Sequence, residues 1–180
     1  MYISTLLIAI SNDVATNPGP GINVAQQLSG CRGLKISHLN IRSLYPKMDE
    51  VRLLLKDQPI DVFTISETWL NPSISDEELS VPGYTILRQD RLEQIGGGTA
   101  MYIRDGLPYC QRFDITDDSH LECCWVEITR PKTKKLIICS TYRAPNFPIT
   151  TFVESFDASL SKIPENAELV VLGDFNVDFN

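Results

Sequence analysis

The chain has 180 residues, 43% of them hydrophobic and 22% charged, which is typical of one globular domain with a substantial core and excludes a disordered chain. Its 16 basic and 23 acidic residues give a net charge of −7, and the pI is about 4.8. A chain this acidic is a poor non-specific binder of nucleic acid, because phosphate neutralisation requires a basic surface.

Residues 1–31 are predicted to form a leader, because an apolar start is followed by the turn-forming run Asn17 to Gly21. The apolar start, Met1 to Ile10, is too short to cross a bilayer. It also lacks the basic residues and the small-residue cleavage site of a signal peptide, since the first basic residue is Arg32. We therefore expect an intracellular protein that is neither secreted nor inserted in a membrane.

From residue 32 onward, predicted strands alternate with predicted helices. Leu34 to Ile41 is typical of a strand, and Pro46 can serve as the first residue of a helix that runs to Asp57. An apolar strand is predicted over Asp61 to Ser66. Three apolar residues at helical spacing would form the buried face of the helix: Met48, Val51 and Leu55.

The middle of the chain predicts further β structure, beginning with a strand over Tyr84 to Leu87. The triplet Gly96 to Gly98 lacks the G-K-[ST] of a phosphate loop and precedes a strand over Thr99 to Arg104, so it indicates tight backbone turning. Glu122 to Thr129 and Lys135 to Thr141 are predicted to form a hairpin. The basic run at its turn is interpreted as solvated: Arg130, Lys132, Lys134 and Lys135.

A last helix is predicted over Phe152 to Ile163, with Thr151 and Glu154 as a capping box and Pro164 as its end. Its apolar residues share one face: Phe152, Phe156 and Leu160. The final strand is predicted over residues 169–172. Mixed strands and helices with two hairpin-like regions favour an α/β sandwich rather than a simple doubly wound sheet.

The five cysteines form no C-x-x-C pair, and with two histidines in the chain they make no recognisable zinc pattern. Their odd number and their places in predicted strands indicate small, reduced core residues rather than disulfides. We expect neither zinc nor a disulfide framework from these residues: Cys31, Cys110, Cys123, Cys124 and Cys139.

Short polar clusters follow three predicted strands: His38 to Asn40, Ser66 to Trp69, and Gly173 to Asn176. Strand ends are where α/β proteins place ligands, because the strand fixes the position while its tip stays accessible. Two carboxylates with two carboxamides nearby are suitable ligands for Mg²⁺, which binds a few oxygen atoms and keeps water for a phosphate. The clusters therefore predict a magnesium site at one end of a sheet.

Five ordered blocks resemble the endonuclease/exonuclease/phosphatase superfamily, and more narrowly the apurinic-type endonuclease domain of non-LTR retrotransposons. They lie in the family's order over roughly residues 34–178. The blocks are His38 to Leu44, Asp61 to Leu70 (DVFTISETWL), Gly96 to Arg104, Ser140 to Asn146 (STYRAPN) and Leu172 to Val177. The resemblance implies that residues 32–180 are the N-terminal portion of this domain, with the two-sheet DNase I-like fold.

The leader separately resembles the ribosome-skipping (2A-type) peptides that precede the endonuclease in some retrotransposons. The similar segment is Asp13 to Pro20 (DVATNPGP), although Ala15 stands where an acidic residue is usual. A proline-rich linker is the alternative interpretation of this segment.

The resemblance implies that Glu67 is the principal ligand of Mg²⁺ or Mn²⁺, with Asn40 and Asp174 beside the same ion. Asp174 would orient or deprotonate the attacking water, and Asn176 would position that water and the scissile phosphate. Such roles suit phosphodiester hydrolysis, which needs a positioned nucleophile and a cation to offset developing negative charge. Asn40 as a turn residue, and Asp174 with Asn176 as an Asx turn, remain alternatives.

Four further residues have weaker roles in this resemblance. Tyr142 stands where the family places a phosphate-contacting tyrosine, although aromatic strand residues usually serve packing. Arg143 and Asn146 would bind substrate beside it. Glu122 occupies a recurring Leu-Glu position and is interpreted as a supporting group. His38 is interpreted as a strand residue rather than a base.

Proteins of this superfamily continue with an aspartate-bearing strand and a Ser-Asp-His-like motif that we do not place in these 180 residues. We therefore expect an incomplete sandwich that is truncated after the GDFN strand, has an open strand edge and has weak activity or none by itself. In the intact protein, the implied function is Mg²⁺-dependent nicking of nuclear target DNA to prime a downstream reverse transcriptase. The alternatives are a phosphatase of the same superfamily and a non-catalytic retroelement remnant.

Overall fold

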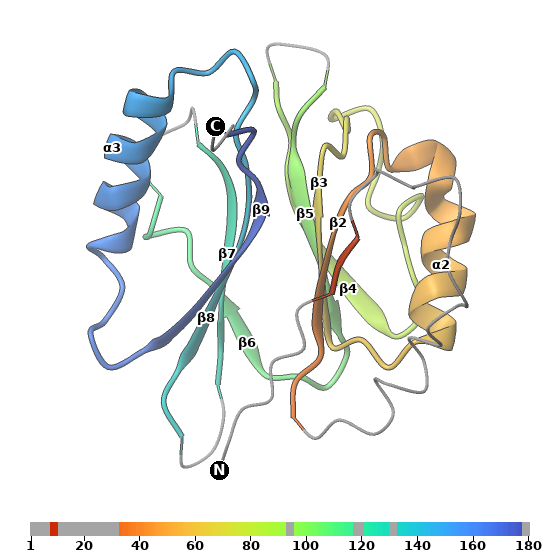
Figure 1. The fold of residues 1–180 in the computed structure, drawn as a ribbon. Helices are drawn as coiled ribbons and strands as arrows, with labels where there is room; N and C mark the ends of the chain where they lie inside the picture. Colours follow the sequence, from red (N-terminus) through yellow and green to blue (C-terminus); the bar gives the residue numbers. More distant parts are fainter. Residues whose placement is uncertain (1–7, 11–32, 93–95, 117–120, 130–132, 178–180) are drawn as a thin grey trace, which may run out of the picture.

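Two β-sheets face each other in the computed structural model, and one helix covers the outer face of each sheet (Figure 1). The structure describes residues 8–10, 33–92, 96–116, 121–129 and 133–177. The strand orders are β1-β2-β3-β5-β4 and β6-β7-β8-β9. The predicted two-sheet α/β sandwich is confirmed.

The first sheet combines parallel and antiparallel pairing. β1, β2 and β3 are parallel, β5 pairs antiparallel with β3, and β4 pairs antiparallel with β5. Its strands are β1 (Ile8–Ile10), β2 (Ile36–Asn40), β3 (Val62–Ser66), β5 (Thr99–Arg104) and β4 (Tyr84–Gln89). The sequence predicted β2 to β5 but not β1, which comes from the segment assigned to the leader. The 2A-like segment itself, Asp13 to Pro20, lies outside the described residues.

The second sheet consists of β6 (Tyr109–Gln111), β7 (Glu122–Ile128), β8 (Leu136–Tyr142) and β9 (Glu168–Asp174). β7 and β8 pair antiparallel, which confirms the predicted hairpin, and β9 pairs parallel to β8. β6 was not predicted, because three residues are too few to show a period. Among the described residues β9 has one strand neighbour, so an edge of this sheet is open as expected. Two members of the basic run, Arg130 and Lys132, lie outside the described residues.

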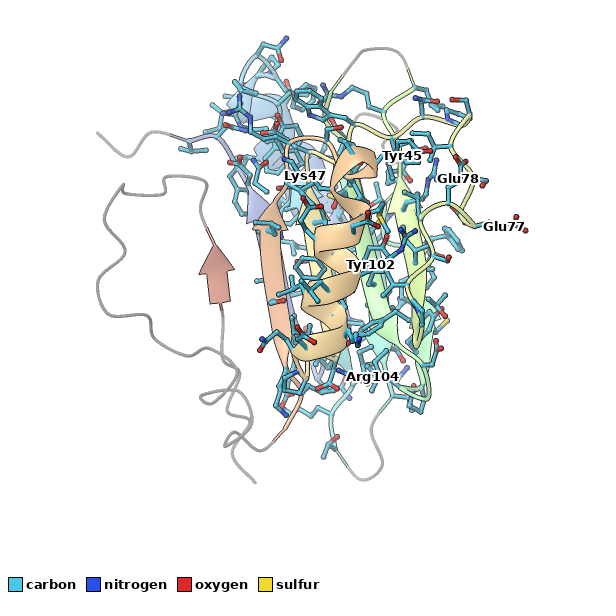
Figure 2. The ribbon with its side chains drawn as sticks, turned by 90° about the vertical axis from the view of Figure 1, so that its right-hand side faces the viewer. Tyr45, Lys47, Glu77, Glu78, Tyr102 and Arg104 are labelled. Carbon is cyan, nitrogen blue, oxygen red and sulfur yellow. The ribbon has the colours of Figure 1, made fainter. Side chains whose placement is uncertain are left out.

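A short 3₁₀ turn, η1 (Tyr45–Lys47), leads into α2 (Met48–Asp57). Pro46 lies in this turn, so the α-helix begins two residues later than predicted and ends at Asp57 as predicted. The predicted face of Met48, Val51 and Leu55 is buried against the first sheet. Tyr102 of β5 packs beneath the helix, and its hydroxyl donates a hydrogen bond to the carbonyl of Leu79 at 2.8 Å (Figure 2).

The second helix, α3 (Ile149–Leu160), begins earlier than predicted, and the proposed capping box is wrong. Pro148 occupies the N-cap, where its fixed φ starts the helix, so Thr151 lies inside the first turn and makes no capping bond. The predicted apolar face is correct. Phe152 and Phe156 stack at 5.4 Å between ring centroids and pack on the second sheet beside Trp125.

The space between the sheets is apolar at one end and polar at the other. Its apolar end holds residues such as Ile36, Val62 and Ile138. Toward the carboxyl ends of β2, β3 and β8 the same faces carry buried polar side chains, and the hydroxyls of Thr99 and Ser140 hydrogen-bond across the sheets. Because buried polar groups need partners, this change marks where the core gives way to a functional site.

The cysteines of the described residues are all free. Cys123, Cys124 and Cys139 are buried, as predicted for small core residues, whereas Cys110 is exposed. Cys31 lies outside the described residues. Within the described ranges, neither helix has the length and apolar character needed to cross a bilayer.

Candidate functional site

Asn40 joins the two carboxylates that the sequence placed at one site. Its Nδ2 atom donates to Glu67 Oε1 at 2.8 Å and to Asp174 Oδ2 at 2.7 Å. Asn40 ends β2, Glu67 follows β3, and Asp174 ends β9 of the opposite sheet. Two acidic side chains from different sheets are therefore held within reach of one ion.

The loops around Asn40 are strained. Five non-glycine residues among those described have positive φ, and each of them lies in the loop that directly follows β2, β3 or β9: Arg42, Ser43, Glu67, Trp69 and Asn176. Non-glycine residues avoid this region unless the surrounding structure holds them there, and such strain gathers at functional sites. Here Ser43 N donates to the carbonyl of Glu67 at 2.9 Å, and Trp69 N donates to that of Gly97 at 2.9 Å.

Asp174 is held by a turn as well as by Asn40. The backbone N–H of Asn176 donates to Asp174 Oδ1 at 3.0 Å, which is an Asx turn, and the side-chain amide of Asn176 donates to the carbonyl of Arg143 at 2.7 Å. The Asx turn that the sequence left as an alternative is therefore present. It does not compete with the site, because it fixes the carboxylate there.

Arg143 does not present its guanidinium to the site. The group donates to the carbonyl of Phe175 at 2.6 Å and also to those of Phe147 and Asn176, and the residue is buried. In this structure the guanidinium therefore holds the turn that follows β9, and a substrate contact by Arg143 stays a prediction. Asn146 lies exposed in the loop after β8.

Tyr142 lies in a row with acidic residues at the end of the second sheet, where β-pairing places Glu122 and Asp174 on either side of it. Burial raises the pKa of Tyr142 to about 12, the charges of Glu67, Asp174 and Glu122 add to this, and Arg91 opposes it. The phenol is therefore a neutral O–H donor near physiological pH.

Sequence reasoning missed Arg91, which sits in the loop after β4 and has no motif around it. Its Nε donates to Glu122 Oε1 at 2.9 Å, and its guanidinium lies 5.7 Å from the centroid of the Tyr142 ring. The other oxygen of Glu122 accepts a hydrogen bond from the N–H of Gly98. Glu122 therefore lies close to the site, as its interpretation as a supporting group requires.

His38 lies between the sheets beside Asn40 and is buried. Its Nδ1 is 2.9 Å from Thr64 Oγ1, and its Nε2 is 3.3 Å from Ser66 Oγ. Burial lowers the pKa of His38 to about 4, and the negative charge of Asp174 partly opposes this. The imidazole is thus neutral and held on both nitrogens, which suits a structural residue.

The pKa of His38 predicts a loss of stability in acid. Below about pH 6.5 the unfolded chain protonates this imidazole and the folded chain does not, so the free energy of unfolding falls until about pH 4. The expected contribution is on the order of 2 kcal/mol. Urea unfolding at pH 7.5 and pH 4.5 would show a smaller acid loss for His38→Gln, and an equal loss in both proteins would refute the assignment.

The residues at the site fit a hard divalent cation. Among the described ion pairs none includes Glu67 or Asp174, so two neighbouring carboxylates have no protein cation to offset their charge. The described residues contain no group of three or more His, Cys, Asp or Glu side chains that could hold a metal. Two carboxylates and a carboxamide that leave room for water match Mg²⁺ better than zinc.

Solved structures that are similar to this chain include two AP endonucleases and a 3′ phosphatase. An AP endonuclease from Leishmania major is similar at a TM-score of 0.56 and 18% identity, over 76% of this chain and 53% of that one. An AP endonuclease from Archaeoglobus fulgidus is similar at a TM-score of 0.55 and 17% identity, over 78% of this chain and 56% of that one. A 3′ phosphatase from Neisseria bound to a product DNA hairpin is similar at a TM-score of 0.52 and 20% identity, over 79% of this chain and 57% of that one.

The chain spans just over half the length of these structures, and at such identities the likeness establishes the fold. No curated protein matches the chain. A family model described as the endonuclease/exonuclease/phosphatase family matches residues 36–180. Proteins of this family generally use divalent metal ions. The match covers most of the chain and includes both carboxylates bridged by Asn40, so the chain belongs to the endonuclease/exonuclease/phosphatase family.

Proposed function

We propose that this site hydrolyses phosphodiester bonds of DNA with a bound Mg²⁺ ion, which Mn²⁺ can replace. The observation that supports this most is the double hydrogen bond from Asn40, which holds Glu67 and Asp174 together at the tips of two sheets. Two fixed carboxylates that have no partner cation among the described ion pairs form a suitable site for one divalent ion.

Each residue of the site has a distinct role in this proposal. Glu67 is the principal ligand, and Asn40 and Asp174 hold the ion or its waters. The bound ion would offset negative charge on the non-bridging oxygens of the phosphate. Asp174 orients the attacking water, Asn176 positions that water, and the neutral phenol of Tyr142 donates a hydrogen bond to the phosphate.

The retrotransposon branch of the family is the finer part of the proposal. It is supported by the sequence blocks Asp61 to Leu70 and Ser140 to Asn146, and by the 2A-like segment Asp13 to Pro20. In an intact protein of this branch, the nick would leave a 3′-hydroxyl that primes a downstream reverse transcriptase. Nicking of target DNA would take place in the nucleus. A reverse-transcriptase reading frame directly after the codon for Asn180 would support this branch.

A phosphatase of the same superfamily is the second candidate, because one of the structures with this fold is a 3′ phosphatase by name. A non-catalytic remnant is the third. A single-copy gene with a stop codon after Asn180 would favour the remnant. The two enzyme candidates differ in substrate, since one cuts a DNA strand and the other releases a terminal phosphate.

Removing the metal should abolish nicking of supercoiled plasmid, and adding Mg²⁺ or Mn²⁺ should restore it. The protein would be placed in excess over plasmid, so that slow nicking is also detected. Release of phosphate from a 3′-phosphorylated oligonucleotide and from a phosphoinositide would be measured in parallel. Nicking that persists in EDTA, or phosphate release without nicking, would contradict the DNA endonuclease proposal.

A further inference from the structure

We propose that Arg91, held by Glu122 over the ring of Tyr142, is a phosphate-binding side chain of this site. The inference deepens the proposed function and rests on it, because it names the group that meets the negative charge of the DNA backbone. Neither the sequence motifs nor the resemblance includes Arg91.

The ion pair between Arg91 and Glu122 is built to fix a guanidinium in one orientation. The side chain of Arg91 is 18% exposed and that of Glu122 is 13% exposed. Arg91 uses Nε and Nη2 on the carboxylate, and in the described part of the chain its Nη1 makes no hydrogen bond. A partly buried guanidinium with one uncommitted nitrogen can reach a phosphate oxygen without losing its carboxylate partner.

The position of Arg91 links it to the proposed metal site. Its guanidinium lies over the ring of Tyr142, 5.7 Å from the centroid, and Tyr142 pairs with Asp174 across β8 and β9. The charges of Glu67 and Asp174 both act on the same phenol. A phosphate that contacts the hydroxyl of Tyr142 would therefore lie between the carboxylates and Arg91.

Glu122 also connects this pair to the loop that carries Glu67. One of its oxygens accepts a hydrogen bond from Gly98 N, and the carbonyl of Gly98 accepts one from Thr68 N at 3.3 Å. A Cβ atom at Gly97 would lie 2.4 Å from the Arg91 guanidinium and 2.5 Å from the Glu122 carboxylate, so a side chain at this position would displace the ion pair. The turn of three glycines thus leaves room for the ion pair.

Charge balance favours the same assignment. The chain carries a net charge of −7, and Glu67 and Asp174 repel a DNA backbone until a metal ion binds. Arg143, the cation that the sequence suggested, is committed to backbone carbonyls. Arg91 supplies a positive charge at the point where the phosphate would approach.

Binding of a fluorescein-labelled DNA duplex in the presence of Ca²⁺, measured by anisotropy, tests the proposal with a divalent ion available to the two carboxylates and with a readout that does not depend on hydrolysis. Arg91→Gln should weaken binding about tenfold and reduce the slope of log affinity against log salt by about 1, since one phosphate contact is lost. A merely structural role would not change the salt slope. The matched control is Arg104→Gln, because Arg104 also pairs with a carboxylate, Asp61, and also lies over a tyrosine ring, 5.0 Å from the centroid of Tyr84. Arg104 ends β5, at the end of that strand away from Gly98 and the proposed site (Figure 2).

The variant Glu122→Gln distinguishes two effects of Glu122 on DNA binding, namely the orientation of Arg91 and the repulsion of DNA by the negative charge of Glu122. Removing a negative charge should by itself tighten DNA binding, whereas loss of the partner that orients Arg91 should weaken it. Because Gln still accepts a hydrogen bond from Gly98, the loop is retained, and we expect about threefold weaker binding. Tighter binding by this variant would overturn the positioning role of Glu122.

The outcomes distinguish this inference from the proposed function. Nicking that Arg91→Gln does not slow, together with an unchanged salt slope, would overturn the role of Arg91 and leave the nuclease intact. If Arg91→Gln reduces the salt slope but the unaltered protein never nicks plasmid, the phosphate contact of Arg91 is supported and the proposed nuclease function is refuted. No measurable DNA binding by the unaltered chain would overturn the Arg91 proposal, while the nicking assay would still decide the function.

Discussion

Replacing Glu67 by Gln is expected to slow Mg²⁺-dependent nicking by about 1,000-fold and to leave thermal stability nearly unchanged. The carboxylate is half-buried and lacks a partner cation among the described ion pairs, so its negative charge is available to a metal. Gln has the same size, and its oxygen can still accept the hydrogen bond from Asn40. The loss would therefore come from the charge and not from the fold.

The control for this variant is Glu77→Gln, because Glu77 is exposed and points away from the molecule (Figure 2). Titration of Mg²⁺ by calorimetry gives a readout that does not depend on turnover, and we expect Glu67→Gln to weaken binding at least tenfold. If Glu67→Gln binds and nicks as well as the unaltered protein, Glu67 is not the metal ligand and the proposed function fails.

Replacing Gly173 by Ala is expected to cost about 3–4 kcal/mol of unfolding free energy, the largest stability effect we predict. A Cβ atom at Gly173 would lie 2.0 Å from the carbonyl oxygen of Thr141, its pairing partner on β8. That oxygen belongs to the backbone of a central strand and cannot move aside without separating β8 from β9. The same separation would displace Asp174.

Gly83→Ala is the matched control for this substitution. Gly83 has a φ of +83°, but nothing lies within 4 Å of the place that a Cβ atom would take, so Ala there should cost only about 1–2 kcal/mol. Urea unfolding of the two variants at neutral pH provides the comparison. Equal losses in the two variants would show that the close approach of β9 to β8 is not the source of the effect.

Several elements were predictable because their determinants are local in the chain. The spacing of Met48, Val51 and Leu55 predicted the buried face of α2, and the β-rich runs around the hairpin predicted β7 and β8. The start of α3 was misplaced because two local signals compete there. Thr151 resembles a cap, but Pro148 with its restricted φ begins the helix three residues earlier.

The sequence by itself determined the family, the two-sheet architecture and the two acidic residues that the strand tips carry. The family and the two-sheet architecture followed from the resemblance of five ordered blocks, and the two carboxylates followed from residue order, because a strand sets the position of a carboxylate at its end. Whether Glu67 and Asp174 meet was decided only by the tertiary structure, since they stand in different sheets and are joined through Asn40. The different surroundings of Arg143 and Arg91 were also visible only there, because the partners that fix each guanidinium, backbone carbonyls after β9 for Arg143 and Glu122 for Arg91, lie far away in the sequence.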